Sequence, residues 1–288
     1  MSSPAARFPP MGEAEGLMEP EGRSGPGRPP RVVDSVLKAT RLLDAYEAGR
    51  PEMTLSELVE RGGYSKSTTY RLLLTLTSAG WLERTPQGTF RLTLKAFRLG
   101  SIVVDSLDLR REAVPIMSGL AAACGASAYL VIAAGRYAVC LERIDDGDTV
   151  RVADLQVGGS QPLHLGAGPR ALLAFNEDVL LGPLLAPGLE ARTPDSIADP
   201  AALRADLAEI RRRGYSISRG DATPGVGALG APVFDATGRA VAALSVGGLL
   251  ERVSPEREPE VSARLLACSR ELSTRLGAKA GQASPGPA

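Results

Sequence analysis

The six residues from Gly225 to Gly230, GVGALG, have the glycine spacing of a loop that holds the pyrophosphate of a dinucleotide. That chemistry needs a strand before the loop and a helix directly after it, because free N–H groups at the helix N-terminus bind the phosphate. Here the run follows Gly220 and Pro224 and leads into an apolar segment with Pro232. These neighbours predict a glycine-rich approach to a strand and argue against a dinucleotide site.

Few other residues have the chemistry for catalysis. The chain has a single histidine, His164, which with Ser160 could begin a hydrolytic triad, but the sequence offers no third partner. It contains no HExxH motif, nucleophile elbow or Walker loop. An enzyme that acts on a small metabolite in the C-terminal part of the chain stays open as the alternative to a binding protein.

The cysteines point to neither disulfides nor metal. Cys124, Cys140 and Cys268 are odd in number, lie far apart and form no C-x-x-C pair. One histidine also excludes a centre built from several histidines. We expect three small buried or half-buried thiols, no metal site and no cofactor.

Length and composition bound the architecture. The chain of 288 residues is 44% hydrophobic, enough for a sizeable core and more typical of two domains than of one. Its apolar runs fall short of the roughly 20 residues of a membrane span, and the N-terminus lacks the apolar stretch of a secretory signal. The prediction is a cytoplasmic protein that does not contact a membrane.

Charge is unevenly distributed although the net charge is zero. From Arg23 to Leu99 the sequence has 13 Lys and Arg against 7 Asp and Glu, a balance of +6; from Gly100 onward it has 19 against 22, a balance of −3. The basic front third suits a polyanion such as DNA, because Lys and Arg release counterions from phosphates. An ordinary solvated basic surface is the plainer alternative.

Three helices and a hairpin are predicted in the basic segment. Asp34 or Ser35 caps the first helix, Thr54 and Glu57 form a capping box at the second, and Ser65 caps the third. Two short strands around a turn at 85–88 follow. This order, with a glycine-bearing turn between the second and third helices, predicts a winged helix-turn-helix, with a helical protein-contact domain as the alternative.

The third helix is predicted to have one buried and one exposed face. Its spacing buries Thr69, Leu72, Leu73 and Leu76. The exposed side carries the short polar and cationic groups that a helix in the major groove needs, together with one leucine: Lys66, Ser67, Tyr70, Arg71 and Leu74.

Behind the hairpin, residues 93–124 read as mostly helical, with Pro115 marking a kink or restart. Part of this segment is too apolar for a lone exposed helix: Ile102, Val103, Leu107 and Leu109. The remaining chain mixes predicted strands and helices, which indicates an α+β domain. The strands are expected within 127–144, at 149–157, at 214–218, at 230–235 and at 239–248, and the helices at 168–175, 200–214 and 255–276.

Three blocks of this sequence resemble the IclR family of bacterial transcription regulators. They are SELVERGGYSKSTTYRLLLTLTSAGWLERTPQGTFRL, LHLGAGPRALLAF, and the segment from Arg192 to Gly248 that ends in GAPVFDATGRAVAALSVGG. The similarity covers nearly everything from Val32 to about Leu276. It implies an α+β protein with an N-terminal winged helix-turn-helix, a linker helix and a C-terminal GAF-like effector-binding domain.

The resemblance also implies site residues and boundaries. The residues expected to contact DNA are Lys66, Ser67, Thr68, Tyr70, Arg71, Arg84 and Gln87. Those expected to line the effector pocket are Gly166, Ala167, Gly168, Ser218, Val226, Ala228, Ser245 and Gly247. The implied segments are a tail at 1–30, the winged helix-turn-helix at 31–93, the linker at 94–109, the effector-binding domain at 110–277 and a tail at 278–288, with both tails disordered by composition.

The implied function is regulation of transcription. The family's members bind a double-stranded DNA operator as dimers or dimers of dimers and respond to a small effector that often carries a carboxylate. The resemblance favours repression, although the residues leave the direction of regulation open. Ser218, Ala228 and Gly247 stand where relatives often have an acid, a cysteine and a serine, so this pocket has fewer polar side chains. A regulator that has lost its ligand response stays open as a further alternative.

Overall fold

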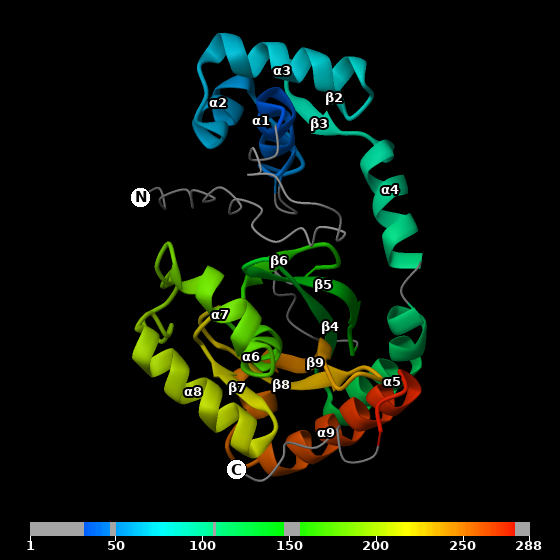
Figure 1. Ribbon diagram of the computed structural model, residues 1–288. Helices are drawn as coiled ribbons and strands as arrows, with labels where there is room; N and C mark the ends of the chain where they lie inside the picture. The colour runs from blue at the N-terminus through cyan, green and yellow to red at the C-terminus, as the bar shows by residue number, and fades with distance from the viewer. Residues whose placement is uncertain (1–31, 47–49, 106–107, 147–155, 280–288) are drawn as a thin grey trace, which may run out of the picture. The chain divides into compact units, whose positions relative to one another are not determined.

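The computed structural model describes residues 32–46, 50–105, 108–146 and 156–279 (Figure 1). The chain divides into two compact units between Ile102 and Val103. The tail predicted at 1–30 lies outside the described residues, and of the tail predicted at 278–288 only Ala278 and Lys279 are described. Ala278 packs with Phe234 and Ala240. The domain boundaries expected at residues 93 and 109 stay predictions.

The N-terminal unit contains three helices and a small sheet, as the sequence indicated. The helices are α1 (Asp34–Leu43), α2 (Leu55–Gly62) and α3 (Lys66–Ser78). The antiparallel sheet has the order β1-β3-β2, with β1 (Glu52–Met53), β2 (Leu82–Arg84) and β3 (Phe90–Leu92). Their shared core is apolar and consists of Leu42, Ala45, Met53, Leu58, Leu73, Leu76, Leu82 and Phe90.

Local capping chemistry starts two of these helices as predicted. The Thr54 hydroxyl accepts the Glu57 N–H while the Glu57 carboxylate accepts the Thr54 N–H, which completes the capping box. Ser65 likewise accepts the N–H of Thr68. The cap predicted for α1 is wrong. The helix begins at Asp34, so its N-cap is Val33, and the Asp34 carboxylate pairs with Lys38 instead.

Two further helices follow the hairpin, α4 (Leu94–Asp105) and α5 (Asp108–Cys124). Pro115 lies inside α5, which continues through it. Leu109, placed by the sequence in a linker too apolar to be an exposed lone helix, is buried in the core of the C-terminal unit. The side chains of Ile102, Val103 and Leu107 lie outside the described part of the chain. Within that part, the structure shows no helix with the length and hydrophobicity needed to span a membrane.

A six-stranded antiparallel sheet forms the centre of the C-terminal unit, in the order β6-β5-β4-β9-β8-β7. Its strands are β4 (Ser127–Ala134), β5 (Tyr137–Ile144), β6 (Ser160–Pro162), β7 (Ser216–Arg219), β8 (Val226–Phe234) and β9 (Ala240–Leu249). A short 3-10 helix, η2 (Leu250–Val253), follows β9.

Helices cover both faces of this sheet (Figure 1). Ala128 and Leu130 pack on one side with α5 and α9 (Glu258–Arg275). Tyr129 and Val131, which alternate with them along β4, pack on the other side with α6 (Ala167–Ala174), α7 (Glu177–Leu185) and α8 (Pro200–Arg213). The two-residue period of a strand thus gives the sheet two separate cores.

Several sequence expectations for this unit need correction. The strand expected at 149–157 falls on residues of which only 156 and 157 are described, and they are not in a strand. The final helix begins at Glu258 rather than at Pro255, because the Ser254 carbonyl first closes a turn with the N–H groups of Arg257 and Glu258. Helix α7 was missed, since Gly182 and Pro183 interrupt an almost uniformly apolar segment. The GVGALG run is itself strand, because β8 begins at Val226.

Candidate functional site

The exposed face of α3 carries the polar residues predicted for DNA contact. Lys66, Ser67, Tyr70 and Arg71 are exposed, whereas Thr69, Leu73 and Leu76 on the opposite side are buried. Thr68 is half-buried and bonds to Ser65 at the start of the helix. Arg84 and Gln87 are exposed in the hairpin. Leu72, also predicted to be buried, is half-buried, and the predicted periodicity of α3 is otherwise confirmed.

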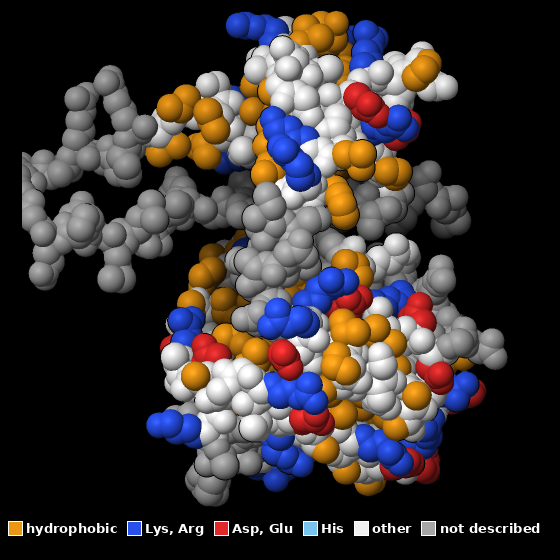
Figure 2. All heavy atoms as spheres, turned by 90° about the vertical axis from the view of Figure 1, so that its right-hand side faces the viewer, with side chains coloured by type: hydrophobic (Ala, Val, Ile, Leu, Met, Phe, Trp, Pro, Cys, Tyr) orange, Lys and Arg blue, Asp and Glu red, His pale blue; other side chains and the backbone are white. Residues whose placement is uncertain are grey.

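The cations of this face differ from the neighbouring Arg91 in whether they form ion pairs. Within the described ranges, Lys66, Arg71 and Arg84 form no ion pair, whereas Arg91 contacts both Glu83 and Glu52. On the surface drawn in Figure 2, the unit that contains α3 shows basic and hydrophobic side chains with little Asp or Glu. An unpaired cation on an exposed helix retains its charge for a polyanion.

A second candidate site is a cavity on the α6 side of the large sheet. All eight residues predicted for an effector pocket line this one cavity, although they come from positions between 166 and 247. The cavity is narrow, about 30 Å³, and mostly apolar. The sequence prediction did not include six other lining residues: Tyr129, Val131, Gln161, Pro169, Ala222 and Thr223.

The N-terminus of α6 borders the cavity. Gly166 precedes the helix with φ +78°, a conformation that favours glycine. Its N–H donates to Oδ2 of Asp221 at 2.8 Å. Among the described residues, the N–H groups of Ala167 and Gly168 have no protein acceptor. These two free donors and the helix dipole favour a negatively charged group at this position.

A close backbone contact holds this helix end against β8. A Cβ on Gly230 would lie 2.5 Å from the carbonyl carbon of Ala167 and 2.7 Å from the backbone nitrogen of Gly168. Glycine is therefore required for this approach. The Ser216 hydroxyl on β7 donates to the carbonyl of Ala167 and fixes the same residue from a second strand.

Two serine hydroxyls of the cavity lining already donate their protons within the protein. Ser245 donates to the carbonyl of Leu229 at 2.8 Å. Ser218 donates to Oδ1 of Asp221. Each of these serines therefore offers a ligand an accepting oxygen, and the backbone N–H groups of α6 are available as donors.

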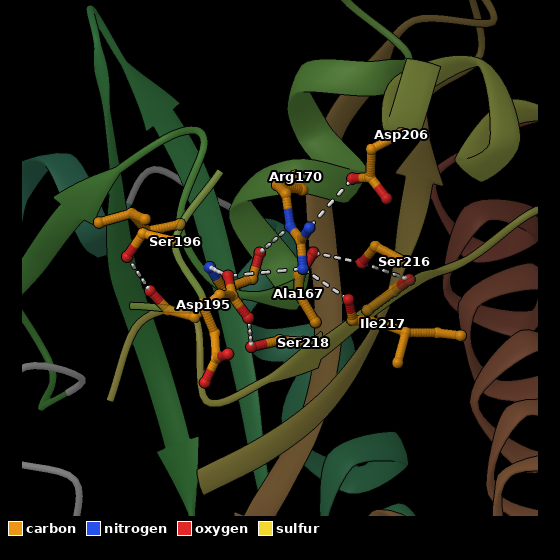
Figure 3. Close-up of polar contacts among 12 residues, drawn as sticks. Ala167, Arg170, Asp195, Ser196, Asp206, Ser216, Ile217 and Ser218 are labelled. Atoms are coloured by element: carbon orange, nitrogen blue, oxygen red, sulfur yellow. Dashed lines mark hydrogen bonds and ion pairs between the residues drawn. The ribbon is translucent and has the colours of Figure 1, made fainter. Parts of the chain in front are cut away.

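A buried arginine ties the elements behind the cavity together (Figure 3). Arg170, only 3% exposed, contacts Asp206 of α8 through Nη1 at 3.0 Å and Asp221 through Nη2 at 3.5 Å. It also donates to the carbonyls of Gly166 and Ile217. Neither Arg170 nor Asp221 was among the predicted site residues. An arginine inside the apolar stretch PRALLAF was the one sequence signal that pointed to them, because a buried guanidinium requires anionic partners.

The groups considered for catalysis are poorly placed for it. Nε2 of His164 lies 2.8 Å from the carbonyl of Glu190, and burial lowers the pKa of His164. Ser160 is exposed on β6. All three cysteines are unpaired and buried or half-buried, as predicted, and burial raises the pKa of the Cys140 thiol to about 12. No cluster of three or more His, Cys, Asp or Glu suited to a metal ion occurs in the described ranges.

Two family models match this chain. The model of the bacterial transcriptional regulator IclR C-terminal domain covers residues 101–274, more than half of the chain, and the model of the IclR helix-turn-helix domain covers residues 35–86. The chain belongs to the IclR family. The resemblance drawn from the sequence is thereby confirmed, together with the α+β architecture that joins a winged helix-turn-helix to an effector-binding domain.

Similar proteins support the same assignment along almost the whole chain. The transcriptional regulator XynR of Escherichia coli K12 is 31% identical over 249 residues, covering 85% of this chain and 98% of XynR. The crystal structure of an IclR transcriptional regulator from Silicibacter sp. TM1040 is 28% identical, with a TM-score of 0.76, covering 88% of this chain and all of the other.

A third relative was crystallised with a small molecule. The IclR homologue from Microbacterium hydrocarbonoxydans, complexed with 4-hydroxybenzoate, is 26% identical, with a TM-score of 0.69 over 84% of this chain and 99% of the other. This chain is thus a transcriptional regulator of the IclR type with a DNA-binding helix-turn-helix domain. The enzyme alternative is not supported.

Proposed function

We propose that this regulator binds its operator through α3 and the β2–β3 hairpin and is controlled by a compact carboxylate in the cavity beside α6. The observation that carries the proposal is the cavity itself. Eight residues from four separate segments converge on it, and it ends at two N–H groups without a protein acceptor in the described chain.

The DNA contacts follow from exposure and charge. Arg71 lies near the middle of the exposed face of α3, where a guanidinium can donate two hydrogen bonds to guanine. Lys66 in the first turn suits a phosphate, as do Ser67, Thr68 and Tyr70 around it. Arg84 and Gln87 project from the hairpin toward the flanking backbone or minor groove. Selection of bound duplexes from a random pool provides the operator for testing these roles.

The ligand must be compact and needs a group that accepts hydrogen bonds. A carboxylate on the N–H groups of Ala167 and Gly168 satisfies the free donors of α6, and the apolar lining covers the rest of the molecule. The 4-hydroxybenzoate complex of the Microbacterium relative supports this class of ligand. The cavity of about 30 Å³ favours a short acid, or a larger acid that displaces the surrounding loops.

We further propose that the active form is a dimer or a dimer of dimers. Helix α4 exposes Leu94 and Phe97, at 82% and 72%, and a second copy would remove both from water. Two-fold symmetry would also match palindromic half-sites. Sedimentation at micromolar concentration is expected to show a dimer or larger species, and a monomer there would contradict this assembly.

The cellular role that fits these features is repression in the cytoplasm, where the operator is accessible. A reporter gene under the selected operator is expected to show lower expression when the regulator is present. Higher expression would assign activation instead.

The ligand assignment is tested by thermal unfolding of the full-length protein against a panel of small acids that includes 4-hydroxybenzoate. A ligand at 100 times its dissociation constant stabilises the protein by about 2.7 kcal/mol. Ala228→Leu fills the cavity from a half-buried lining position and is expected to abolish the shift. Ala134→Leu adds the same volume at an exposed position at the end of β4, outside the cavity, and is expected to leave the shift intact. A hit that stabilises Ala228→Leu as strongly as the parent would place the ligand elsewhere.

A further inference from the structure

Asp221 holds the position that a bound anion takes at a helix N-terminus. Its Oδ2 accepts the N–H of Gly166 at 2.8 Å and its Oδ1 accepts the hydroxyl of Ser218. The residue is only 4% exposed. One anion position at this end of α6 is therefore filled by the protein, directly beside the free N–H groups of Ala167 and Gly168.

The carboxylate of Asp221 is fixed. Its backbone carbonyl accepts hydrogen bonds from the hydroxyls of Ser196 at 2.7 Å and Thr193 at 3.3 Å. Its side chain is bonded to two further residues, so any movement away from α6 would break several hydrogen bonds at once. Ala222 and Thr223, the next residues of the chain, line the cavity. A ligand in the cavity thus lies close to a negative charge that these hydrogen bonds hold behind the lining.

The cation beside Asp221 is shared with a second carboxylate. Arg170 is 3.5 Å from Asp221 but closer to Asp206, at 3.0 Å, and its other contacts are carbonyls (Figure 3). Arg213 is near Asp206, on the same helix. Asp195 adds a second carboxylate beside the loop, since its Oδ2 lies 3.0 Å from the position of a Cβ on Gly220. No described lining residue of the cavity is Lys or Arg.

We infer that Asp221 determines specificity by restricting the ligand to one negative charge. The cavity takes a monocarboxylate on the N–H groups of Ala167 and Gly168 and rejects a dicarboxylate of the same size. A second carboxylate would find no described Lys or Arg in the cavity lining and would be repelled by the nearby carboxylate of Asp221, whose cation, Arg170, is shared with Asp206. This inference rests on the proposed function, in which the cavity binds a carboxylate effector.

The test is isothermal titration of the full-length protein with three matched pairs of acids: propionate and malonate, butyrate and succinate, benzoate and terephthalate. The wild type is expected to bind the better monocarboxylates at least about tenfold more tightly than their partners, a typical effect of one partly screened charge nearby. Asp221→Asn removes the charge with little change of shape. The ratio of the two dissociation constants in each pair is expected to fall about tenfold.

Two variants separate charge selection from a general loosening of the network. Ser196→Ala removes a hydrogen bond to the backbone carbonyl of Asp221 without changing any charge, and is expected to keep the wild-type discrimination. Asp221→Glu keeps the charge and is expected to retain most of the discrimination between monocarboxylates and dicarboxylates. If Asp221→Asn does not fold, the inference is decided by the discrimination measured in the wild type and in Asp221→Glu.

The outcomes are distinct. Equal binding of both members of each pair by the wild type overturns the inference and leaves the carboxylate effector in place. Discrimination that persists in Asp221→Asn, or falls equally in Ser196→Ala, also overturns it. If no acid binds either the wild type or Asp221→Asn, the proposed carboxylate site fails and the inference fails with it.

Discussion

The cations of α3 and the buried Arg170 of α6 show how differently the two units use charge. Lys66 and Arg71 lie exposed with no ion-pair partner in the described chain, whereas Arg170 is 3% exposed and contacts two carboxylates and two carbonyls. An exposed charge costs little to maintain and is available to phosphate. A buried charge needs partners and in return fixes the elements around it. This difference fits the proposal that the first unit contacts a large partner and the second encloses a small one.

The largest effect that separates the two regions is expected for Arg170→Ala. This change leaves the buried Asp221 and the half-buried Asp206 without their shared cation, which costs about 3–5 kcal/mol of unfolding free energy. Arg71→Ala, its exposed counterpart, is expected to stay within about 0.5 kcal/mol of the wild type. Urea unfolding of both variants measures the difference, and similar losses in the two would break the comparison.

DNA binding is expected to respond in the opposite way. Arg71→Ala is expected to weaken binding to the selected operator by about 1–3 kcal/mol and to relax its base preference. Lys66→Ala is expected to weaken binding to all duplexes alike and to reduce the salt slope by about one. Fluorescence anisotropy at several salt concentrations distinguishes them. Unchanged affinity in both variants would remove α3 from the interface.

A backbone contact of the cavity gives a smaller effect. Gly230→Ala places a methyl group against the backbone of Ala167 and Gly168, which is expected to displace the start of α6 and to cost about 1–3 kcal/mol. Ligand binding is expected to weaken with it while operator binding is retained. If the variant has the unfolding free energy and the ligand affinity of the wild type, this close approach is not required.

The smallest effect is expected at the capping box of α2. Thr54→Ala removes the acceptor for the Glu57 N–H and is expected to cost about 1 kcal/mol. Because this cap belongs to the N-terminal unit, ligand binding is expected to be unaffected. A change in ligand affinity larger than twofold would show that the two units are more tightly coupled than their separate cores suggest.

The same contrast explains what could be predicted from the sequence. Thr54, Glu57 and Ser65 act within three residues of their partners, so their roles follow from spacing alone. The exposed face of α3 follows from helical periodicity in the same way. Strand β1 was missed because two residues contain no periodic signal.

The cavity depends on residues that are distant in the sequence. Its eight predicted members came from a family resemblance and not from spacing, and their role as a ligand site stays a prediction. Gly166 and Asp221 are 55 residues apart, and Arg170 and Asp206 are 36 apart. Such pairs form only when α6, α8 and the loop before β8 pack together, and no local sequence pattern predicts that packing.

The account is tested most directly by measuring operator affinity with and without a stabilising acid, in the wild type and in Ala228→Leu. If the cavity controls DNA binding, saturating ligand is expected to change the wild-type dissociation constant by about 5- to 150-fold, the usual range of coupling between two sites. Ala228→Leu is expected to bind the operator but to show no change with ligand. A wild-type affinity that is the same with and without bound acid would contradict control of this regulator through the α6 cavity.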